Sequence, residues 1–460
     1  MGHDESRRRF VKHLGLLGGA WVFPIFSWPG QAYGKNKEFK SHFFLQVFFE
    51  GGWDSSYLFD ARSLKMTQEN LIQNYVNEEP FVWEAAGGRR TLASPLVRPL
   101  KKFRRDLTII KGVNTLPNFD GHPHNLRYYF SGKPLSSGCF LEGLGKRVQG
   151  YPLDYVQIGK PVGVASLGNK GLNVDPSEIG VLHDAVGLVP ESLDGPSAQY
   201  LRNQYAANAG EASEFQRGQR DLLAALDGQE SLVRAMKKVN LAADNIDIRQ
   251  RGLGVVKSYF QAGVCQGAII IYGRDRFDLD SHSDVLAKGQ PAQYKKLVAE
   301  IDEILSYLKR TAFDNRKSML DVTTVSFGSE FGRSMKVSGA RVDSSGTNHN
   351  TFNNMILLAG RGIKGGQIVG ETDYHSGSEV LSPAHLGRDP DKVKVMGKPY
   401  DFTAQRVIDR PLEVYKSGDY ITMASILNTI YHLLDVDKKR YWALPDDRKA
   451  IAPILKSVLS

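Results

Sequence analysis

The chain of 460 residues has few cysteines, no long apolar run beyond its first thirty residues, and no internal repeat or long low-complexity tract. Its two cysteines, Cys139 and Cys265, permit at most one disulfide. They are either a pair formed in an oxidising compartment or two buried thiols. No segment after the first thirty residues is apolar enough to span a bilayer, so we expect no permanent membrane anchor.

The composition, with 41% hydrophobic and 24% charged residues, is typical of a soluble globular protein. The length allows one large α/β domain or two smaller ones. The net charge of +9 does not indicate a nucleic-acid partner, because the basic residues are scattered and several of them belong to the N-terminal segment.

That N-terminal segment is the most informative part of the chain. Residues 6–12 read SRRRFVK and precede an apolar run over residues 14–28, which Pro29 ends. The run is shorter than the ~20 residues that a membrane-spanning helix needs, so it is expected to be removed. The pattern predicts a twin-arginine signal peptide over residues 1–34, with cleavage after Gly34. The alternative is a basic amphipathic N-terminus of a cytoplasmic protein.

A twin-arginine signal predicts a periplasmic or secreted protein whose partner during export is the twin-arginine translocase. This route carries proteins that have already folded, often around a bound cofactor. A metal site that is loaded before export would fit the choice of this route.

Apolar segments rich in strand-forming residues alternate with helical patterns along the rest of the chain. This alternation predicts a layered α/β fold with a sheet covered on both faces. We expect a single domain over residues 35–460 with insertions at about 161–250, of which 161–195 is read as a long surface excursion. The predicted strands are 42–49, 106–113, 267–272, 321–327 and 355–359, and the predicted helices are 197–225, 230–239, 293–311 and 420–434.

Acidic and imidazole side chains follow or precede four of these strands. Ligands bind beyond the carboxyl ends of strands in open α/β sheets, so such residues converge there if the fifth strand runs antiparallel to the others. Carboxylate oxygens and neutral imidazoles bind divalent ions such as zinc, manganese, calcium or magnesium, and this set can hold one or two of them. The candidate metal ligands are Asp54, Asp280, His282, Glu330 and His349.

Three more residues extend this predicted site. His122 and His124, after the second strand, add two imidazoles at the same edge, or they are surface histidines in a proline turn. Arg333 is a natural fork for a tetrahedral anion such as phosphate or sulfate, or one member of a structural ion pair.

At these residues the chain resembles the bacterial domain-of-unknown-function family 1501, which belongs to the alkaline-phosphatase-like superfamily with the sulfatases. The resemblance covers most of the chain after the leader. It is carried by FEGGWD at residues 49–54, FDLDSH at 277–282, SEFGRS at 329–334 and LLAGRGIKGGQIVG at 357–370.

This resemblance implies an alkaline-phosphatase-like three-layer α/β/α sandwich, with a central mixed, mostly parallel sheet and a metal centre at its carboxyl edge. By position, Asp54, Asp280, His282, Glu330 and His349 match metal ligands, and His124 matches a histidine usually preceded by serine. The chain departs from the family pattern at Asn348, where members usually carry an aspartate before the histidine. The departure removes a negative charge and a good metal ligand.

Enzymes of the superfamily use a serine, threonine or modified cysteine nucleophile, and no residue of this sequence can be assigned to that role from its motif. Thr115 at the end of the second strand is the best placed hydroxyl, with Ser55 and Ser56 as alternatives. The expected function is an exported metal-dependent hydrolase of a small-molecule or glycan-linked phosphate or sulfate ester, with Arg333 binding the anion. The alternatives are a catalytically lapsed member that binds envelope material or a protein, and an isomerase or transferase.

Overall fold

The computed structural model describes residues 42–63, 78–115, 121–132, 139–142, 144, 151, 153–159, 171–174, 235, 238–239, 252–284, 288–337, 347–374, 381, 395–409, 414–447 and 449–460. The chain divides into two compact units, residues 1–38 with 180–238 and residues 39–179 with 239–460. The second unit contains nearly all of the described residues. The predicted signal peptide and the predicted helix over 197–225 lie outside the described residues, as does nearly all of the one over 230–239.

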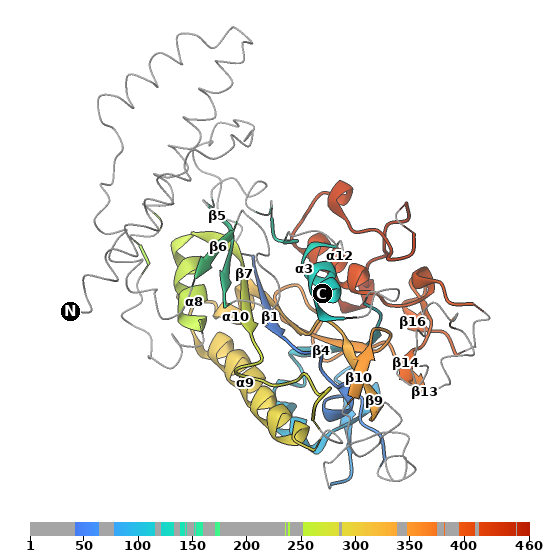
Figure 1. Cartoon of the computed structure of the whole chain (residues 1–460). Coiled ribbons are helices and arrows are strands. Elements are labelled where there is room, and N and C mark those ends of the chain that lie inside the picture. The colour runs from blue at the N-terminus through green and yellow to red at the C-terminus, as the bar shows by residue number, and fades with distance from the viewer. Residues whose placement is uncertain are drawn as a thin grey trace, which may run out of the picture. The chain divides into compact units, whose positions relative to one another are not determined.

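An eight-stranded sheet forms the centre of the second unit, in the order β12-β4-β11-β8-β1-β7-β5-β6. Neighbouring strands are parallel except around β11, which is antiparallel to both β4 and β8 (Figure 1). The strands are β1 (Phe43–Phe49), β4 (Leu107–Val113), β5 (Leu153–Ile158), β6 (Gly171–Val174), β7 (Cys265–Tyr272), β8 (Thr323–Gly328), β11 (Asn354–Gly360) and β12 (Ile368–Val369).

The five strands predicted from sequence are confirmed as β1, β4, β7, β8 and β11, and the fifth runs antiparallel as the site prediction required. The segment 161–195 was expected to be only a surface excursion, which is wrong for residues 171–174. These residues pair with β5 as the edge strand β6. A four-residue edge strand in a glycine-rich stretch has too short an apolar run to show the strand period.

Helices cover both faces of the sheet, α8 and α9 on one side and α3 and α12 on the other (Figure 1). Their bounds are α3 (His122–Ser131), α8 (Leu253–Ala262), α9 (Gln290–Arg310), α10 (Met319–Val322) and α12 (Met423–Leu433). The helices predicted over 293–311 and 420–434 are thus confirmed as α9 and α12. The layered α/β fold with a mixed, mostly parallel sheet is confirmed as well.

Strand β1 packs against a helix on each face of the sheet, α8 on one face and α3 on the other. Successive side chains point to opposite faces of a strand. Phe43 stacks on Phe260 of α8, with ring centroids 4.5 Å apart. Phe48 instead lies 4.9 Å from the rings of Tyr129 and Phe130 in α3. A strand buried on both faces needs a continuous apolar sequence, which is why FFLQVFF could be recognised.

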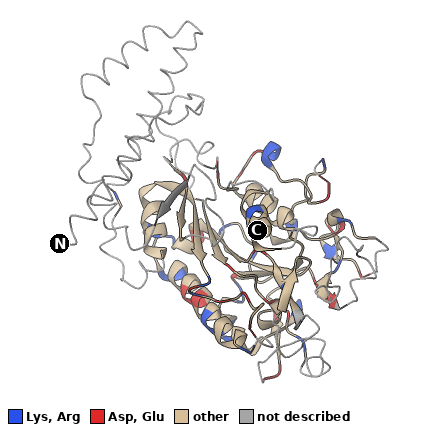
Figure 2. Ribbon diagram, viewed as in Figure 1, with Lys and Arg blue, Asp and Glu red and all other residues tan. Residues whose placement is uncertain are grey.

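Helix α9 shows the complementary pattern of a surface helix. Leu297, Ile301, Ile304 and Leu308 are buried at the spacing of one helical stripe. Charged residues alternate with this stripe along α9, as the blue and red segments of its ribbon in Figure 2 show, and Lys295, Lys296, Lys309 and Arg310 are exposed. Burial of this apolar stripe fixes the helix against the layer beneath it.

Several short strands and 3₁₀ helices lie outside the eight-stranded sheet. They are the strands β2 (Phe81–Glu84), β3 (Arg90–Ala93), β9 (Gly332–Val337), β10 (Thr347–Asn350), β13 (Thr372–Tyr374), β14 (Val395–Gly397), β15 (Tyr400–Asp401) and β16 (Arg406–Val407), and the 3₁₀ helices η1 (Ser55–Tyr57), η2 (Pro95–Phe103), η5 (Ser417–Asp419), η6 (Lys438–Arg440) and η7 (Lys456–Val458). The two-stranded sheet of β9 and β10 matters most for function, because it carries His349 beside Arg333.

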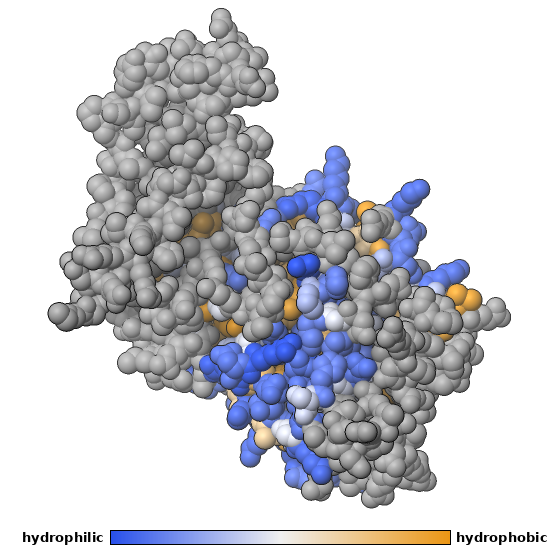
Figure 3. Space-filling model, in the orientation of Figure 1, coloured by the Kyte–Doolittle hydropathy of each residue, from blue (hydrophilic) through white to orange (hydrophobic). Residues whose placement is uncertain are grey.

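The described surface visible in Figure 3 is mainly hydrophilic. Four large apolar side chains are exposed among the described residues, Val82, Leu92, Val414 and Ile451. None of the described helices combines the length and the apolar character needed to cross a bilayer. Cys139 and Cys265 are both buried free thiols, so the structure shows the second of the two cysteine alternatives.

Candidate metal centre

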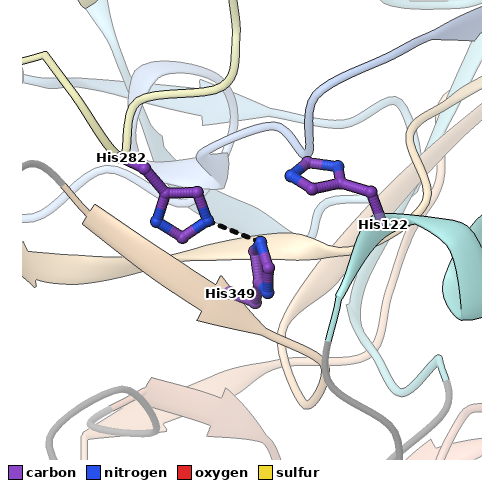
Figure 4. Close-up of side chains that lie close together, drawn as sticks. All are labelled: His122, His282 and His349. Carbon is purple, nitrogen blue, oxygen red and sulfur yellow. Dashed lines mark hydrogen bonds between the residues drawn. The ribbon is translucent and has the colours of Figure 1, made fainter. Parts of the chain in front are cut away.

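Three histidines from distant parts of the sequence meet at the carboxyl edge of the sheet. His122 begins α3, His282 lies in the loop after β7, and His349 lies in β10. One ring nitrogen of each lies within 4.8 Å of the others. Figure 4 shows the three rings facing one another, with Nε2 of His282 and Nε2 of His349 2.6 Å apart. We call these three residues the histidine cluster.

Glu330 fixes the orientation of His122. Nδ1 of His122 lies 2.7 Å from Oε1 of Glu330. The same carboxylate accepts hydrogen bonds from the backbone N–H of Gly51 and the hydroxyl of Ser329. With Nδ1 bound to a carboxylate, the ring presents Nε2 to the cluster, which is the usual arrangement of a metal-binding histidine.

The Nε2 atom of His122 is buried, and its contact with Oδ2 of Asp280 is long, at 3.5 Å. A buried nitrogen with so weak a partner costs free energy, and a bound cation would remove that cost. Burial lowers the pKa of His122, but the hydrogen bonds to Asp280 and Glu330 outweigh burial and raise it above its usual value. Both carboxylates therefore attract positive charge to this ring, whether a proton or a metal ion. The residues present fit a divalent ion.

The cluster contains His122 and not His124, although the sequence pattern gave His124 the stronger match. The two histidines lie in the first turn of α3, where residues two apart face nearly opposite directions. His124 is half-buried and is not part of the cluster. Sequence reasoning placed this segment in a loop, yet Pro123 in the first turn is a helix-start signal that could have revealed the geometry.

His282 carries little positive charge in this setting. Burial, together with Arg333 and His349 nearby, lowers its pKa to about 4. A neutral imidazole is the form that binds metal ions. The two imidazoles that the sequence assigned as ligands, His282 and His349, are brought together, and the lowered pKa of His282 favours its metal-binding form.

Asp280 lies beside the cluster and is held by two arginines. Its Oδ1 is 2.7 Å from Nη2 of Arg333, and its Oδ2 is 2.6 Å from Nη1 of Arg274. Its Oδ2 is also 3.5 Å from Nε2 of His122. Burial raises the pKa of Asp280, but hydrogen bonding to His122 and the charge of Arg333 outweigh burial and hold it far below its usual value. Asp280 is therefore a carboxylate at the edge of the cluster.

Arg333 is buried, with only 1% of its side chain exposed. Its Nε donates to the carbonyls of Gly51 and Gly52, its Nη2 to Gly51 and Asp280, and its Nη1 to Thr347. Gly52 allows this packing because a Cβ there would lie 2.2 Å from the Phe331 ring and 3.2 Å from Nε of Arg333. The sequence left two alternatives for Arg333, an anion-binding fork and a structural ion pair, and these contacts show an ion pair with Asp280.

Asp54 is not one of the three residues of the histidine cluster. It caps η1, where Oδ1 accepts a hydrogen bond of 2.8 Å from the backbone of Ser56. Its Oδ2 is buried without a hydrogen-bond partner. Burial raises the pKa of Asp54 to about 7. No ion pair or hydrogen bond joins this carboxyl group to the three histidines in the described part of the chain.

Thr115 lies at the end of β4 with its hydroxyl already engaged. It donates to the carbonyl oxygen of Thr351 at 3.3 Å, and its backbone N–H bonds to the same carbonyl. No hydrogen bond joins Thr115 to the histidine cluster within the described residues. Of the alternative hydroxyls, Ser55 contacts Asp60 and Asn353.

Asn348, the departure from the family pattern, lies next to His349 in β10. Its Oδ1 accepts a hydrogen bond of 2.8 Å from the backbone of His349, and its own N–H donates to Ser334. Arg274, which the sequence did not select for the site, contacts Asp280 directly, as does His122, which the sequence offered together with His124.

Comparison with known proteins gives one family match. The model of the family described as "Protein of unknown function (DUF1501)" matches residues 44–388, which is more than half of the chain. No match was found among curated proteins.

Solved structures give only distant similarity. The lipoteichoic acid synthase LtaP from Listeria monocytogenes is 9% identical, with a TM-score of 0.36, and the match covers 90% of this chain and 75% of that one. An alkaline phosphatase superfamily protein from Vibrio parahaemolyticus is 12% identical, with a TM-score of 0.30 and 90% of each chain covered. A 2-O GAG sulfatase is 12% identical, with a TM-score of 0.29 and 91% and 76% covered. Scores this low carry no argument about activity.

Proposed function

The chain belongs to the DUF1501 family, whose function is unknown, and from its site we propose that it is a metal-dependent hydrolase of phosphate or sulfate esters. One observation carries the proposal: three imidazole nitrogens converge within 4.8 Å at the carboxyl edge of the sheet. Catalytic zinc sites have three protein ligands and keep a further position open. The geometry supports one ion, and imidazole ligands favour zinc.

His122, His282 and His349 would hold this ion. Glu330 keeps Nδ1 of His122 hydrogen-bonded, so that Nε2 stays available for the ion and the ring cannot rotate freely. A bound divalent ion would supply Lewis acidity that polarises the ester oxygen and lowers the pKa of a water molecule. Asp280 adds a negative charge beside the cluster, which strengthens the attraction for a cation.

The proposal assigns no nucleophilic side chain. The Thr115 hydroxyl donates to a backbone carbonyl and makes no hydrogen bond to the histidine cluster among the described residues. A nucleophile needs a base or a metal ion within hydrogen-bonding or coordination distance. Hydrolysis by an activated water is the reaction class that the arrangement supports best.

The test uses the full-length chain loaded with zinc or manganese and a panel of chromogenic phosphate monoesters, phosphate diesters and sulfate esters. We expect hydrolysis of at least one ester class, its loss on chelation, and its loss in His282→Ala. The matched control is His432→Ala, since His432 is an exposed histidine on α12. Equal activity in His282→Ala and His432→Ala would refute the site assignment.

A second candidate is a non-catalytic member that binds envelope material or a protein partner. Asn348 favours it, because an uncharged amide that bonds to the backbone of His349 stands where the family usually has an aspartate. Stoichiometric zinc binding without turnover of any ester in the panel would support this candidate.

We also propose that the protein acts outside the cytoplasm after export by the twin-arginine translocase. The support is the SRRRFVK sequence at residues 6–12 followed by a short apolar run. Changing Arg7 and Arg8 together to lysine should leave the protein in the cytoplasm, measured by cell fractionation. Unchanged export of this variant would refute the twin-arginine route.

A further inference from the structure

Arginine side chains bind oxyanions through a planar fork of N–H donors, so a guanidinium binds an oxyanion best through donors that the protein does not already use. Arg333 does not meet this condition. Its Nε and Nη2 donate to Gly51, Gly52 and Asp280, its Nη1 makes a long hydrogen bond of 3.5 Å to Thr347, and its side chain is 1% exposed. Recruiting Arg333 to a substrate would break contacts that hold Gly51 and Asp280 in place.

Arg274 has the free donors that Arg333 lacks. Its side chain is 35% exposed, and Nη1 bonds to Oδ2 of Asp280 at 2.6 Å. Its Nε is buried without a hydrogen-bond partner. Across the described residues, Asp280 is the ion-pair partner of Arg274. A buried N–H without a partner costs free energy, which an incoming oxygen atom would recover.

Arg274 is also within reach of the histidine cluster. The Asp280 oxygen that it contacts is 3.5 Å from Nε2 of His122, so Nη1 of Arg274 lies at most about 6 Å from that nitrogen. Metal–ligand bonds of about 2 Å on each side of a zinc ion and a hydrogen bond of about 2.8 Å span this distance. One tetrahedral oxyanion can therefore contact the metal position and the arginine together.

The charges around this position permit an anion. Asp280 is shared by two arginines, Arg274 and Arg333, and Glu330 is paired with His122. The carboxylates near the cluster thus each have a cationic or hydrogen-bonding partner. A divalent ion on the three histidines would make the local charge positive.

We propose that Arg274 is the residue that binds the oxyanion of phosphate or sulfate esters at this site, and that Arg333 is a positioning residue that holds Gly51, Gly52 and Asp280. The inference rests on the proposed metal at the histidine cluster. It names the ligand class of the site as a tetrahedral oxyanion, bound by an arginine from the loop that follows β7.

The test measures binding of inorganic phosphate and, separately, inorganic sulfate to the zinc-loaded full-length protein by isothermal titration calorimetry. Arg274→Gln is compared with Arg276→Gln. Arg276 is the matched control because it lies in the same loop, is similarly exposed at 37%, and pairs with Glu300 instead of Asp280. Zinc content and thermal melting are measured for every variant.

We expect Arg274→Gln to weaken phosphate or sulfate binding at least tenfold with zinc content unchanged, and Arg276→Gln to leave binding within about twofold. The anion that binds with the higher affinity, phosphate or sulfate, indicates which ester class the site accepts. Equal weakening in both variants, unchanged binding in Arg274→Gln, or no binding of either anion by the zinc-loaded wild type would overturn the inference.

These outcomes are separable from failure of the proposed function. A wild-type protein that takes up no zinc contradicts the metal centre itself. Anion binding that is lost in Arg274→Gln but is indifferent to zinc removal contradicts the inference that one anion contacts the metal and Arg274 together, while zinc uptake with unchanged anion binding in Arg274→Gln contradicts the role of Arg274 alone. Arg274→Lys should recover part of the affinity, because lysine keeps the charge and loses the fork.

Discussion

Two buried polar centres of the molecule differ in how their charges are compensated. In the Asp60 centre, Oδ1 of Asp60 is bonded by Lys111 at 2.9 Å, by Thr372 at 2.6 Å and by Arg62 at 3.2 Å. Burial raises the pKa of Asp60, but Arg62 and Lys111 outweigh it, so the pKa is lowered and the carboxylate stays charged. In this centre the buried negative charge of Asp60 is neutralised by cationic side chains of the protein itself, without any ligand.

The histidine cluster is different because groups of one kind converge there. Three imidazoles meet within 4.8 Å, and the buried Nε2 of His122 makes a long contact of 3.5 Å with Oδ2 of Asp280. A buried polar network in which every charge has a partner of the opposite sign stabilises the fold. A cluster of like imidazoles that face one another instead indicates a site for a ligand. The comparison predicts that damage to the first centre lowers stability, and that damage to the second lowers metal affinity.

The largest expected effect is on stability and comes from Asp60→Asn. The change keeps the shape of the side chain and leaves Lys111, which is 6% exposed, as a buried charge without its carboxylate. Breaking one side of a buried ion pair costs about 3–5 kcal/mol, measured as the free energy of unfolding in urea. Asp106→Asn removes the exposed pair with Lys309 and should cost less than about 1 kcal/mol. Similar losses in the two variants would contradict the comparison.

The next effect is on metal binding and comes from His349→Ala. Removing one of three ligands should weaken zinc binding at least about 100-fold, which exceeds the effect of losing an orienting partner. Zinc affinity is measured by competition with a chelator of known affinity. His349 is buried against the Phe331 ring, so the free energy of unfolding of the metal-free variant is measured as well, and it should fall by less than the about 3–5 kcal/mol expected for Asp60→Asn. A variant that keeps wild-type zinc affinity would remove His349 from the site.

A smaller effect is expected from Glu330→Gln, which preserves shape but weakens the bond that orients His122. Loss of such a partner typically reduces metal affinity about 10–100-fold. The matched control is Glu303→Gln on the outer side of α9, where Glu303 forms an exposed pair with Arg310. If Glu330→Gln binds zinc as tightly as Glu303→Gln does, Glu330 has no orienting role.

The smallest effect concerns His42, which lies before β1 at the opposite end of the sheet and bonds to Thr324 at 2.8 Å. Burial and then Arg361 lower its pKa to about 4. Below about pH 6.5 the His42 imidazole is protonated in the unfolded chain but stays neutral in the folded protein. The free energy of unfolding should therefore fall as the pH drops from about 6.5 to about 4. His42→Gln should flatten this part of the urea-stability profile without changing zinc content. An unchanged slope would contradict the assignment.

The sequence allowed most of the sheet to be predicted. Strand β1 is buried on both faces, so its sequence is apolar at every position except Gln46 and is followed by a polar loop. The antiparallel direction of β11 was needed to bring His349 to the carboxyl edge, and the structure has it. Strand β6 was missed because four edge residues carry too little pattern.

The contacts of the site were less predictable. The sequence indicated which loops meet, but whether His122 or His124 faces the cluster depends on where α3 begins. Likewise Arg333 carries the family motif, while its approach to Gly51 depends on the close packing of β9 against the end of β1. Such choices depend on angles and distances between remote segments, which spacing along the chain does not encode.

The most direct test of the account is anomalous diffraction at the zinc absorption edge from crystals of the zinc-loaded protein. The account predicts one strong peak at about 2.0–2.1 Å from a ring nitrogen of each of His122, His282 and His349, and no peak at His42 or His124. A peak elsewhere, or no peak in crystals grown with excess zinc, would contradict the central claim that these three histidines hold a metal ion.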